Sequence, residues 1–372
     1  MGQQSDGYEI GLALSGGGYR ATLYSLGSLW RLNELGYLRK ISIITSVSGG
    51  SITSGVLGRR WGELKFENDV AINFKSAVAD RIQKFCKRTI DVGSVLGGLI
   101  SPFYSISNRV AKQYNEHLFK GATLQDLPDS MQEGNPRFIF YATSLQSGAS
   151  VRMSRTRLAD YKVGQINNPT IPLAEAVAAS SAFPPVLSPA IMELDPSLWS
   201  DPGGAYLFPN KKYRSKLYLT DGGVYDNMGL EKIWDTCRTV LLSDAGAPLK
   251  TTPKPPTLPL QQTVRVMDII TDQTRALRKR KLISDFQKGE RKGTYWGINT
   301  EIDNYKAEGL LVHDSAITKK LSKIRTRLNK FSDKEQERLI NWGYALADAA
   351  MRSWVDRDAK PGSLPFPNRP LL

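Results

Sequence analysis

The chain has 372 residues, with 50 Lys and Arg against 36 Asp and Glu, and a formal charge of +14. Hydrophobic residues make up 41% of it, which provides for a globular core and excludes a disordered chain. The positive charge favours anionic partners, namely lipid headgroups, nucleic acid or acidic proteins, without distinguishing among them. Only two histidines occur, His117 and His313, and neither lies in a recognisable catalytic pattern. A serine–histidine triad would have to use one of them.

The sequence lacks the patterns of disulfide-rich, zinc-binding, secreted, myristoylated and membrane-spanning proteins. Cys86 and Cys237 lie far apart and lack the spacing of metal ligands, so neither a disulfide framework nor a zinc site is expected. The N-terminus lacks a signal segment, and Asp6 stands where a myristoylation motif requires Ser or Thr. No stretch reaches the ~18 apolar residues of a membrane span. We therefore expect a cytoplasmic protein.

The N-terminal part alternates strands and helices. The apolar run Tyr8–Leu14 predicts a buried strand, and helical spacing of apolar residues predicts a helix over Tyr19–Leu35, ended by Gly36. The β-branched run Ile41–Val47 predicts a second strand, followed by a helix to about Trp61. This order predicts an α/β fold with a parallel sheet covered by helices on both faces.

The middle of the chain, from Lys65 to Lys120, is expected to be mostly helical and basic. It is interrupted by the apolar, Gly-rich segment Val92–Ile106, for which a core-packing loop is favoured over a substrate-facing cap. His117 is expected in a helix and His313 at the edge of a strand.

Later elements follow the same rules. Further strands are expected at Arg137–Leu145, Val151–Ser154, Lys216–Thr220 and Thr239–Ser243, and a small-residue helix at Leu173–Ala182. Arg275–Lys292 has eight Lys and Arg against two acids and is expected to be an exposed helix. Ser332–Ser353 begins with a capping box and is then amphipathic, which predicts a packed helix.

A glycine-rich turn follows the first strand, with the sequence SGGGYR at Ser15–Arg20. Consecutive glycines allow close backbone approach, and the helix N-terminus favours an anion, which is either a phosphate or a developing oxyanion. A Walker A loop is excluded because the turn lacks the Gly-Lys-Ser/Thr ending. The dinucleotide fingerprint is formally matched by Gly16, Gly18 and Ala21, but the next strand lacks the acid that would bind the ribose.

That next strand ends in the sequence SVSGG at positions 46–50. It resembles the G-x-S-x-G nucleophile elbow with Ser46 in place of the first glycine, and Ser48 stands between a strand and a helix as the elbow requires. An ordinary strand-to-helix turn is the alternative. The neighbouring glycine loop could place N–H donors ~3 Å from an oxyanion formed at Ser48.

A third motif, Asp221-Gly-Gly, follows the strand KLYLT. An Asx turn is the simple interpretation. However, a serine nucleophile needs a base, and the scarcity of histidine favours a carboxylate. Asp221 could take the proton of Ser48 during attack and return it to the leaving group.

In this order, GGGYR, SVSGG and DGG resemble the patatin-like phospholipase family of bacterial type, which uses a Ser/Asp dyad without histidine. Ala178–Pro185 and Asp226-Asn227 extend the resemblance over most of Gly11–Ala247, and the stretch from Ile324 is similar to that of bacterial members. The resemblance implies a three-layer fold with a mostly parallel central sheet flanked by helices. We expect a catalytic domain at 1–250 and a basic, mainly helical extension at 251–372, packed on the same domain.

The resemblance also implies residue roles. Ser48 would be the nucleophile and Asp221 the base. The oxyanion hole would be formed by the backbone at Gly16, Gly17, Gly18 and Gly49. Arg20 stands where the family carries a basic residue, and would either bind a substrate phosphate bidentately or pair with a structural carboxylate. No cofactor or metal is implied, and the segment after Asp221 lacks the alternating acids of a calcium loop.

The implied activity is that of a lipid acyl hydrolase of phospholipase A or lysophospholipase type, acting on a phospholipid or other acyl-ester lipid at a transient anionic membrane surface. A variant hypothesis is a latent membrane-degrading effector that a signal switches on, as in bacterial antiphage defence. The alternative is a non-catalytic basic protein that binds nucleic acid or anionic membrane, motivated by the charge and by Arg275–Lys292. Nucleic acid is disfavoured because the chain lacks zinc-finger, RNA-recognition and helix-turn-helix signatures.

Overall fold

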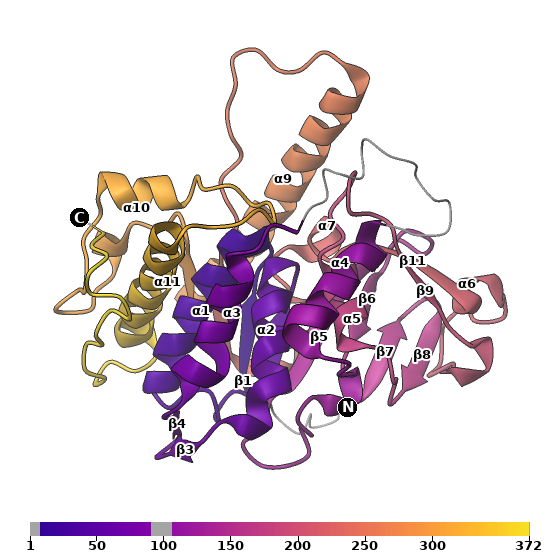
Figure 1. Cartoon of the computed structure of the whole chain (residues 1–372), viewed down its shortest axis with the longest axis horizontal. Helices are drawn as coiled ribbons and strands as arrows, with labels where there is room; N and C mark the ends of the chain where they lie inside the picture. Colours follow the sequence, from indigo (N-terminus) through magenta and orange to yellow (C-terminus); the bar gives the residue numbers. More distant parts are fainter. Residues whose placement is uncertain (1–7, 91–105, 372) are drawn as a thin grey trace.

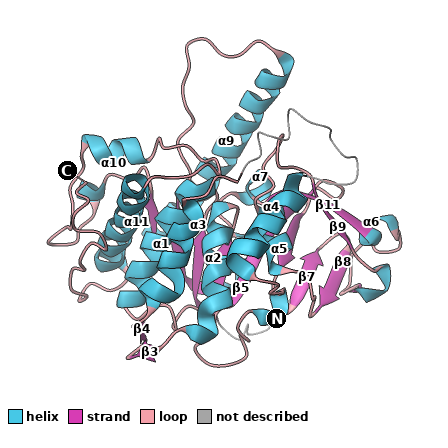
Figure 2. Cartoon of the chain, viewed as in Figure 1, coloured by secondary structure: helices cyan, strands magenta, loops and turns pink. Residues whose placement is uncertain are grey.

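One large sheet organises the chain in the computed structural model, which describes residues 8–90 and 106–371. Eleven described strands form this sheet, and helices cover both of its faces (Figures 1 and 2). The predicted apolar segment Val92–Ile106 lies outside the described residues except for Ile106, which begins a helix.

The sheet has one continuous path and one branch. In spatial order, the path is β10 (Trp199–Ser200), β8 (Gly164–Asn167), β7 (Arg157–Asp160), β6 (Ser150–Met153), β5 (Arg137–Ser144), β2 (Ile43–Ser46), β1 (Tyr8–Leu14), β12 (Cys237–Asp244) and β13 (Lys292–Gly297). The branch consists of β11 (Lys216–Asp221), which pairs with β5, and β9 (Ala190–Glu193), which pairs with β11. A separate hairpin joins β3 (Phe66–Glu67) and β4 (Val70–Ala71).

Parallel and antiparallel pairing divide the sheet into two halves. The strands β5, β2, β1, β12 and β13 pair in parallel. The expectation of a mostly parallel sheet is right for this half only, because β5 to β8 follow one another through short turns and must pair antiparallel. The α/β fold with a central sheet flanked by helices is confirmed.

Two helical layers bury the two faces of the sheet. One layer contains α1 (Gly18–Glu34), α2 (Gly49–Arg60), α3 (Asp80–Cys86), α4 (Ile106–Tyr114), α5 (Leu173–Ser180) and α11 (Asp333–Trp354). The other contains α8 (Glu231–Thr236) and α9 (Pro259–Gln287), with α7 (Gly223–Asp226) beside α9. Short helices α6 (Lys212–Ser215) and α10 (Ala316–Leu321) lie at the periphery. Along β1, Leu12 and Leu14 join the first core and Ala13 the second, as strand alternation requires.

Local sequence signals located most of these elements. Gly36 follows α1 with φ 71°, a left-handed conformation that suits glycine and ends the helix. Ser332 accepts from the Glu335 N–H and Glu335 returns the bond, which confirms the capping box of α11. His117 lies in a π-helical turn, so the expected helix is confirmed. The strand edge expected at His313 is wrong, because that segment is a loop in which His313 Nδ1 pairs with Asp303 at 2.6 Å.

The C-terminal part is more closely joined to the sheet than its composition indicated. The sequence did not predict β13, which pairs with β12 in the main sheet. Helix α11 packs against α1 at Gly27 and Gly343, where an added Cβ would overlap backbone atoms of the facing helix. The buried pair Arg31–Asp348 joins the same two helices at 2.7 Å. A domain boundary near residue 250 stays a prediction.

Candidate active site

The candidate nucleophile and base come together because two strands approach each other end to end along β5. β2 runs parallel to β5 and places Ser46 opposite Phe140. β11 runs antiparallel to β5 and places Asp221 opposite Ala142. Since two residues of a strand span about 7 Å, the carboxyl ends of β2 and β11 almost meet on the same edge of β5. Ser48 follows one end and Asp221 forms the other.

Ser48 has the strained backbone of a nucleophile elbow. Its φ is 51° and its ψ is −120°, a conformation that costs a residue with a Cβ of the order of 1–3 kcal/mol. Strain of this kind persists only where the surrounding contacts enforce it. The residue is 8% exposed, so the turn lies in a largely buried junction.

Asp221 is a buried carboxylate that is incompletely paired. It is 1% exposed, and Oδ1 accepts from the Gly223 N–H at 2.7 Å. Burial raises the pKa of Asp221 to about 7, while the Gly223 N–H and the Ser48 hydroxyl lower it by less. Among the described residues, Oδ2 has no partner that meets the distance and angle of a full hydrogen bond, and the Ser48 hydroxyl lies close enough to the carboxylate to lower its pKa. Catalytic pairs commonly tighten only when substrate binds.

The end of α5 holds both candidate catalytic residues. The Ser48 N–H donates to Ser180 at both the carbonyl, 3.2 Å away, and the hydroxyl, 3.1 Å away. The Gly222 N–H donates to the same Ser180 carbonyl at 3.3 Å, and the Asp221 N–H donates to Ala182 O at 3.0 Å. One turn of chain therefore fixes the backbone of the elbow and of the DGG motif relative to each other.

Buried serine hydroxyls form a hydrogen-bonded network next to the elbow. Ser180 Oγ lies 2.8 Å from Ser51 Oγ, which donates to Ser46 Oγ at 3.1 Å. Ser46 Oγ in turn donates to the Ile139 carbonyl at 3.4 Å. Ser46 replaces the first glycine of the usual elbow motif, and its hydroxyl belongs to this network. The sequence motifs did not indicate Ser180 or Ser51, although Ser180 lies in a segment that carried the family resemblance.

The glycine loop brings backbone N–H groups to the elbow. The N–H of Gly16 donates to the Asn227 carbonyl at 3.0 Å and is not free to bind a ligand. The N–H groups of Gly17, Gly18 and Gly49 have no acceptor among the described residues. These three, rather than Gly16, are the donors that could face an oxyanion at Ser48.

Close backbone contact explains why glycines occupy these positions. A Cβ on Gly49 would overlap the carbonyl of Gly18, and a Cβ on Gly18, whose φ is +55°, would overlap the carbonyl of Thr326. A Cβ on Gly16 would come within 3.1 Å of Ser48 Cβ. The loop and the elbow are therefore packed directly on each other, and larger residues would separate them.

Arg20 is held by backbone carbonyls. It is 2% exposed, its Nη2 donates to Ala245 O at 2.7 Å, and its Nη1 donates to Ile324 O at 2.9 Å and Ser322 O at 3.4 Å. Burial lowers its pKa to about 10. These contacts favour a positioning role, in which Arg20 ties the C-terminal segment to the glycine loop. Its hydrogen-bond partners are backbone carbonyls, while the nearby Asp244 carboxylate acts to raise its pKa. Binding of a substrate phosphate by Arg20 stays a prediction.

Other candidate groups lie elsewhere. His313 is an exposed partner of Asp303. Among the described residues, no cluster of three or more His, Cys, Asp or Glu is arranged to hold a metal ion. No described helix combines the length and the apolar character needed to cross a membrane.

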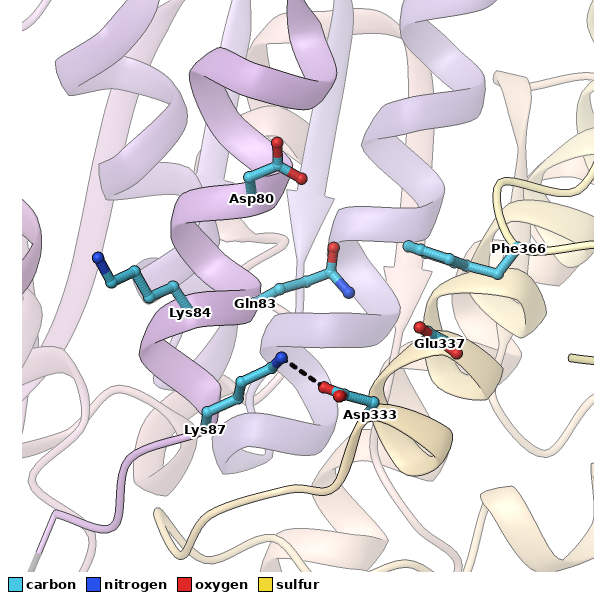
Figure 3. Close-up of a pocket in the computed structure, with 7 residues that line it drawn as sticks. All are labelled: Asp80, Gln83, Lys84, Lys87, Asp333, Glu337 and Phe366. Carbon is cyan, nitrogen blue, oxygen red and sulfur yellow. Dashed lines mark ion pairs between the residues drawn. The ribbon is translucent and has the colours of Figure 1, made fainter. Parts of the chain in front are cut away.

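A surface cavity of about 290 Å³ lies between α3 and α11 (Figure 3). Its lining is mostly charged, and Lys87 Nζ pairs with Asp333 Oδ1 across it at 2.7 Å. A second cavity, of about 200 Å³, is lined by residues of the α5 start and β9. Neither lining includes a residue of the predicted dyad or oxyanion hole.

Two solved structures of one phospholipase share the fold over most of this chain. Human GIVD cytosolic phospholipase A2 in complex with methyl gamma-linolenyl fluorophosphonate inhibitor and terbium chloride aligns with a TM-score of 0.50 and 14% identity, over 91% of this chain and 57% of that one. Its complex with methyl gamma-linolenyl fluorophosphonate gives a TM-score of 0.50 and 14% identity, over 93% and 58%. VipD from Legionella pneumophila aligns at a TM-score of 0.39 and 14% identity, over 92% and 66%. The chain thus spans less than two thirds of each of these structures.

No curated protein sequence matches this chain. A sequence model of the family described as patatin-like phospholipase matches residues 12–234, which is more than half of the 372 residues. The matched range contains the glycine loop, the elbow, the end of α5 and the DGG motif. The chain belongs to the patatin-like phospholipase family.

Proposed function

We propose that the protein is a lipid acyl hydrolase of phospholipase A or lysophospholipase type, with Ser48 as nucleophile and Asp221 as base. The observation that carries the proposal is the strained Ser48 turn beside a buried carboxylate whose pKa lies near 7. A base with a pKa near the working pH combines a large ionised fraction with real affinity for the proton. Family membership supports the substrate class.

In the proposed reaction, Ser48 Oγ attacks the acyl carbonyl of the lipid and its proton passes to Asp221. Charge on the carbonyl oxygen is stabilised by the N–H groups of Gly17, Gly18 and Gly49, which have no acceptor within the described part of the chain. Asp221 returns the proton to the departing alcohol oxygen. Water then attacks the acyl-enzyme and gives a proton to Asp221, which passes it to Ser48 Oγ as the acyl–oxygen bond breaks and the fatty acid is released.

Latency is part of the proposal, in the form of an effector switched on by a signal. Two observations support it: Ser48 is 8% exposed and Asp221 is 1% exposed, so an acyl chain needs further opening to reach them. The backbone of Thr326 also lies against the glycine loop. We propose that the reaction takes place at an anionic membrane surface, from the cytoplasmic side.

The test compares three proteins on two substrates. Wild type, Ser48→Ala and Asp221→Asn are assayed on a medium-chain fluorogenic ester and on phospholipid vesicles, with released fatty acids identified by mass spectrometry. His117→Ala is the matched control, since it changes a titratable group outside the dyad. Hydrolysis by wild type and control but by neither dyad variant supports the proposal. Equal hydrolysis by wild type and Ser48→Ala contradicts it. Absence of hydrolysis from both is what latency predicts without the signal, and a fluorophosphonate adduct on Ser48 then distinguishes a latent enzyme from the non-catalytic binding protein.

A further inference from the structure

Helix α9 is longer than the strands that it connects. It joins β12 to β13, which pair in parallel, so it must run back along the sheet between them. Its 29 residues span about 43 Å, whereas the eight residues of β12 span about 27 Å. Its C-terminal part is fixed by the buried residues Leu282 and Asp285. The excess length therefore extends at the N-terminal end, as Figure 1 shows.

This extension stands on the edge of the sheet that carries the candidate active site. β12 ends at Asp244 on the edge where β1 and β2 also end, because the three strands are parallel. The helix is anchored next to the site by Arg278, whose Nη1 pairs with Asp226 Oδ2 of α7 at 3.4 Å. We call the segment Leu258–Leu277 the α9 projection.

The α9 projection exposes apolar side chains on one side. Val266, Ile270 and Leu277 recur at intervals of four and seven residues, which places them on one face of the helix, and Ile269 borders that face. Leu258 and Leu260 are exposed at its start. The exposed fractions of these six residues lie between 39% and 68%. Uncovered apolar surface of this kind marks a place of contact with a partner or a membrane.

The charge around the α9 projection is positive, although Arg275, Arg278 and Lys281 pair with Asp244, Asp226 and Asp285. Residues 246–281 contain eight Lys and Arg against two Asp. Arg280 is exposed and follows Leu277 by three residues, so it lies on the apolar face at the base of the projection. Lys254 is exposed in the loop before the helix. An anionic bilayer offers a partner for both kinds of side chain: its acyl layer accepts apolar side chains, and its headgroups attract cations.

Further exposed apolar side chains surround the site itself. Phe183 follows Ala182, whose carbonyl accepts from the Asp221 N–H, and Val224 is three residues beyond Asp221. Both are about two-fifths exposed. A bilayer that contacted the α9 projection would therefore also meet apolar side chains next to the dyad.

We propose that the α9 projection docks the protein on an anionic lipid bilayer and directs the Ser48–Asp221 site toward it. The inference rests on the proposed acyl-hydrolase function, because that function requires the site to face lipid. The apolar face of the α9 projection enters the interface, and Arg280 and Lys254 contact headgroup phosphates. Docking of this kind depends on both apolar burial and anionic charge.

Vesicle binding tests the proposal. The full chain carrying Ser48→Ala, which prevents hydrolysis during the measurement, is mixed with vesicles of phosphatidylglycerol and phosphatidylcholine or of phosphatidylcholine alone. We expect binding to the anionic vesicles, and a loss of at least tenfold when Val266→Ser, Ile270→Ser and Leu277→Ser are added together. The matched control is Ile72→Ser with Met131→Ser.

The control removes apolar side chains at the opposite edge of the sheet. Ile72 is 58% exposed next to β4, and Met131 is 88% exposed in the loop before β5 begins at Arg137. Both sets change exposed residues, so unfolding midpoints should agree among the variants. Equal binding by the α9 set and the control set would overturn the proposal. If the α9 set left vesicle binding unchanged but converted a dimer to a monomer, the proposal would be overturned, and the α9 projection would instead contact a second copy of this chain.

A second measurement separates this inference from the proposed function. In chains with Ser48 intact, the ratio of vesicle turnover to soluble short-chain ester turnover should fall at least tenfold in the α9 set only. Leu260→Cys labelled with an environment-sensitive dye should shift to shorter wavelength on anionic vesicles, since the native Cys86 and Cys237 are buried. Binding that depends on the α9 set without any Ser48-dependent hydrolysis would contradict the proposed function and leave docking supported.

Discussion

Replacing Asp221 with Asn should abolish turnover and, at the same time, stabilise the fold at neutral and higher pH. The substitution keeps the shape of the side chain, and the amide oxygen can still accept from the Gly223 N–H, as Oδ1 does at 2.7 Å. The amide nitrogen replaces Oδ2, which has no full hydrogen bond among the described residues. The variant therefore lacks only the buried carboxyl group that ionises.

The sign and size of the effect follow from the pKa of Asp221, which burial raises from 3.8 to about 7. The folded protein holds this proton more tightly than the unfolded chain does. The stabilisation from Asp221 is therefore fully present below pH 3.8 and is lost as the pH rises through about 7. At about 1.4 kcal/mol per pH unit the whole loss is about 4 kcal/mol, of which about 2–3 kcal/mol falls between pH 5 and pH 8.

The assay is urea unfolding of wild type and Asp221→Asn at pH 5 and pH 8, followed by tryptophan fluorescence. The free energy of unfolding of the variant, relative to wild type, should increase by about 2–3 kcal/mol from pH 5 to pH 8. Asp195→Asn is the control: Asp195 is exposed, and the Ser197 N–H lowers its pKa, so its ionisation is complete at both pH values. The reasoning would be refuted if the free energies of unfolding of wild type and Asp221→Asn changed equally between pH 5 and pH 8. It would also be refuted if the variant lost stability relative to wild type over that range. Wild-type kcat/KM should rise with pH to a plateau above about 7.

Three further predictions concern the surroundings of the dyad. Ser180→Ala removes an acceptor of the Ser48 N–H, so kcat should fall about tenfold with little change in KM and stability should fall by about 1–2 kcal/mol. The buried hydroxyl of Ser54 has no partner among the described residues, so Ser54→Ala should change neither kcat nor stability. Equal effects of Ser54→Ala and Ser180→Ala would argue against a positioning role for Ser180. Gly49→Ala places a Cβ against a carbonyl of the glycine loop and should lose activity and about 1–3 kcal/mol, which unfolding and ester hydrolysis would measure. His117→Ala and His313→Ala should hydrolyse esters at the wild-type rate, and a large loss in either would require a different base.

Local patterns in the sequence were sufficient for the parallel half of the fold. The run Tyr8–Leu14 is the observed β1, and the predicted helices after the two glycine motifs are α1 and α2. Each of these elements is specified by its own residues: β-branched and apolar runs for strands, glycines for the turns, and helical spacing afterwards. The capping box of α11 is equally local.

The meeting of the two site residues could not be predicted from local patterns. The sequence places Asp221 at the end of a strand, but its proximity to Ser48 depends on β11 pairing antiparallel with the far part of β5. Such pairing is set by contacts between segments distant in sequence. The resemblance to a family supplied that proximity instead. For the same reason, the engagement of the Gly16 N–H by Asn227 and of Arg20 by Ala245 appeared only in three dimensions.

The role of Ser180 was also beyond the sequence. Its segment was recognised as a shared feature, yet nothing in its local pattern indicates that its carbonyl accepts from both the Ser48 and Gly222 N–H groups. A small buried side chain near the end of a helix is equally typical of simple packing. Only the hydrogen bonds of Ser180 with the N–H groups of Ser48 and Gly222 place it between the two candidate motifs.

Covalent labelling tests the central claim most directly. A long-chain fluorophosphonate transfers its phosphonyl group to a nucleophilic serine with loss of fluoride, and peptide mass spectrometry identifies the modified residue. We expect a single adduct on Ser48 in wild type, strongly slowed labelling in Asp221→Asn, and none in Ser48→Ala. An adduct on another serine, or equal labelling of wild type and Asp221→Asn, would contradict the assignment of Ser48 and Asp221 as nucleophile and base.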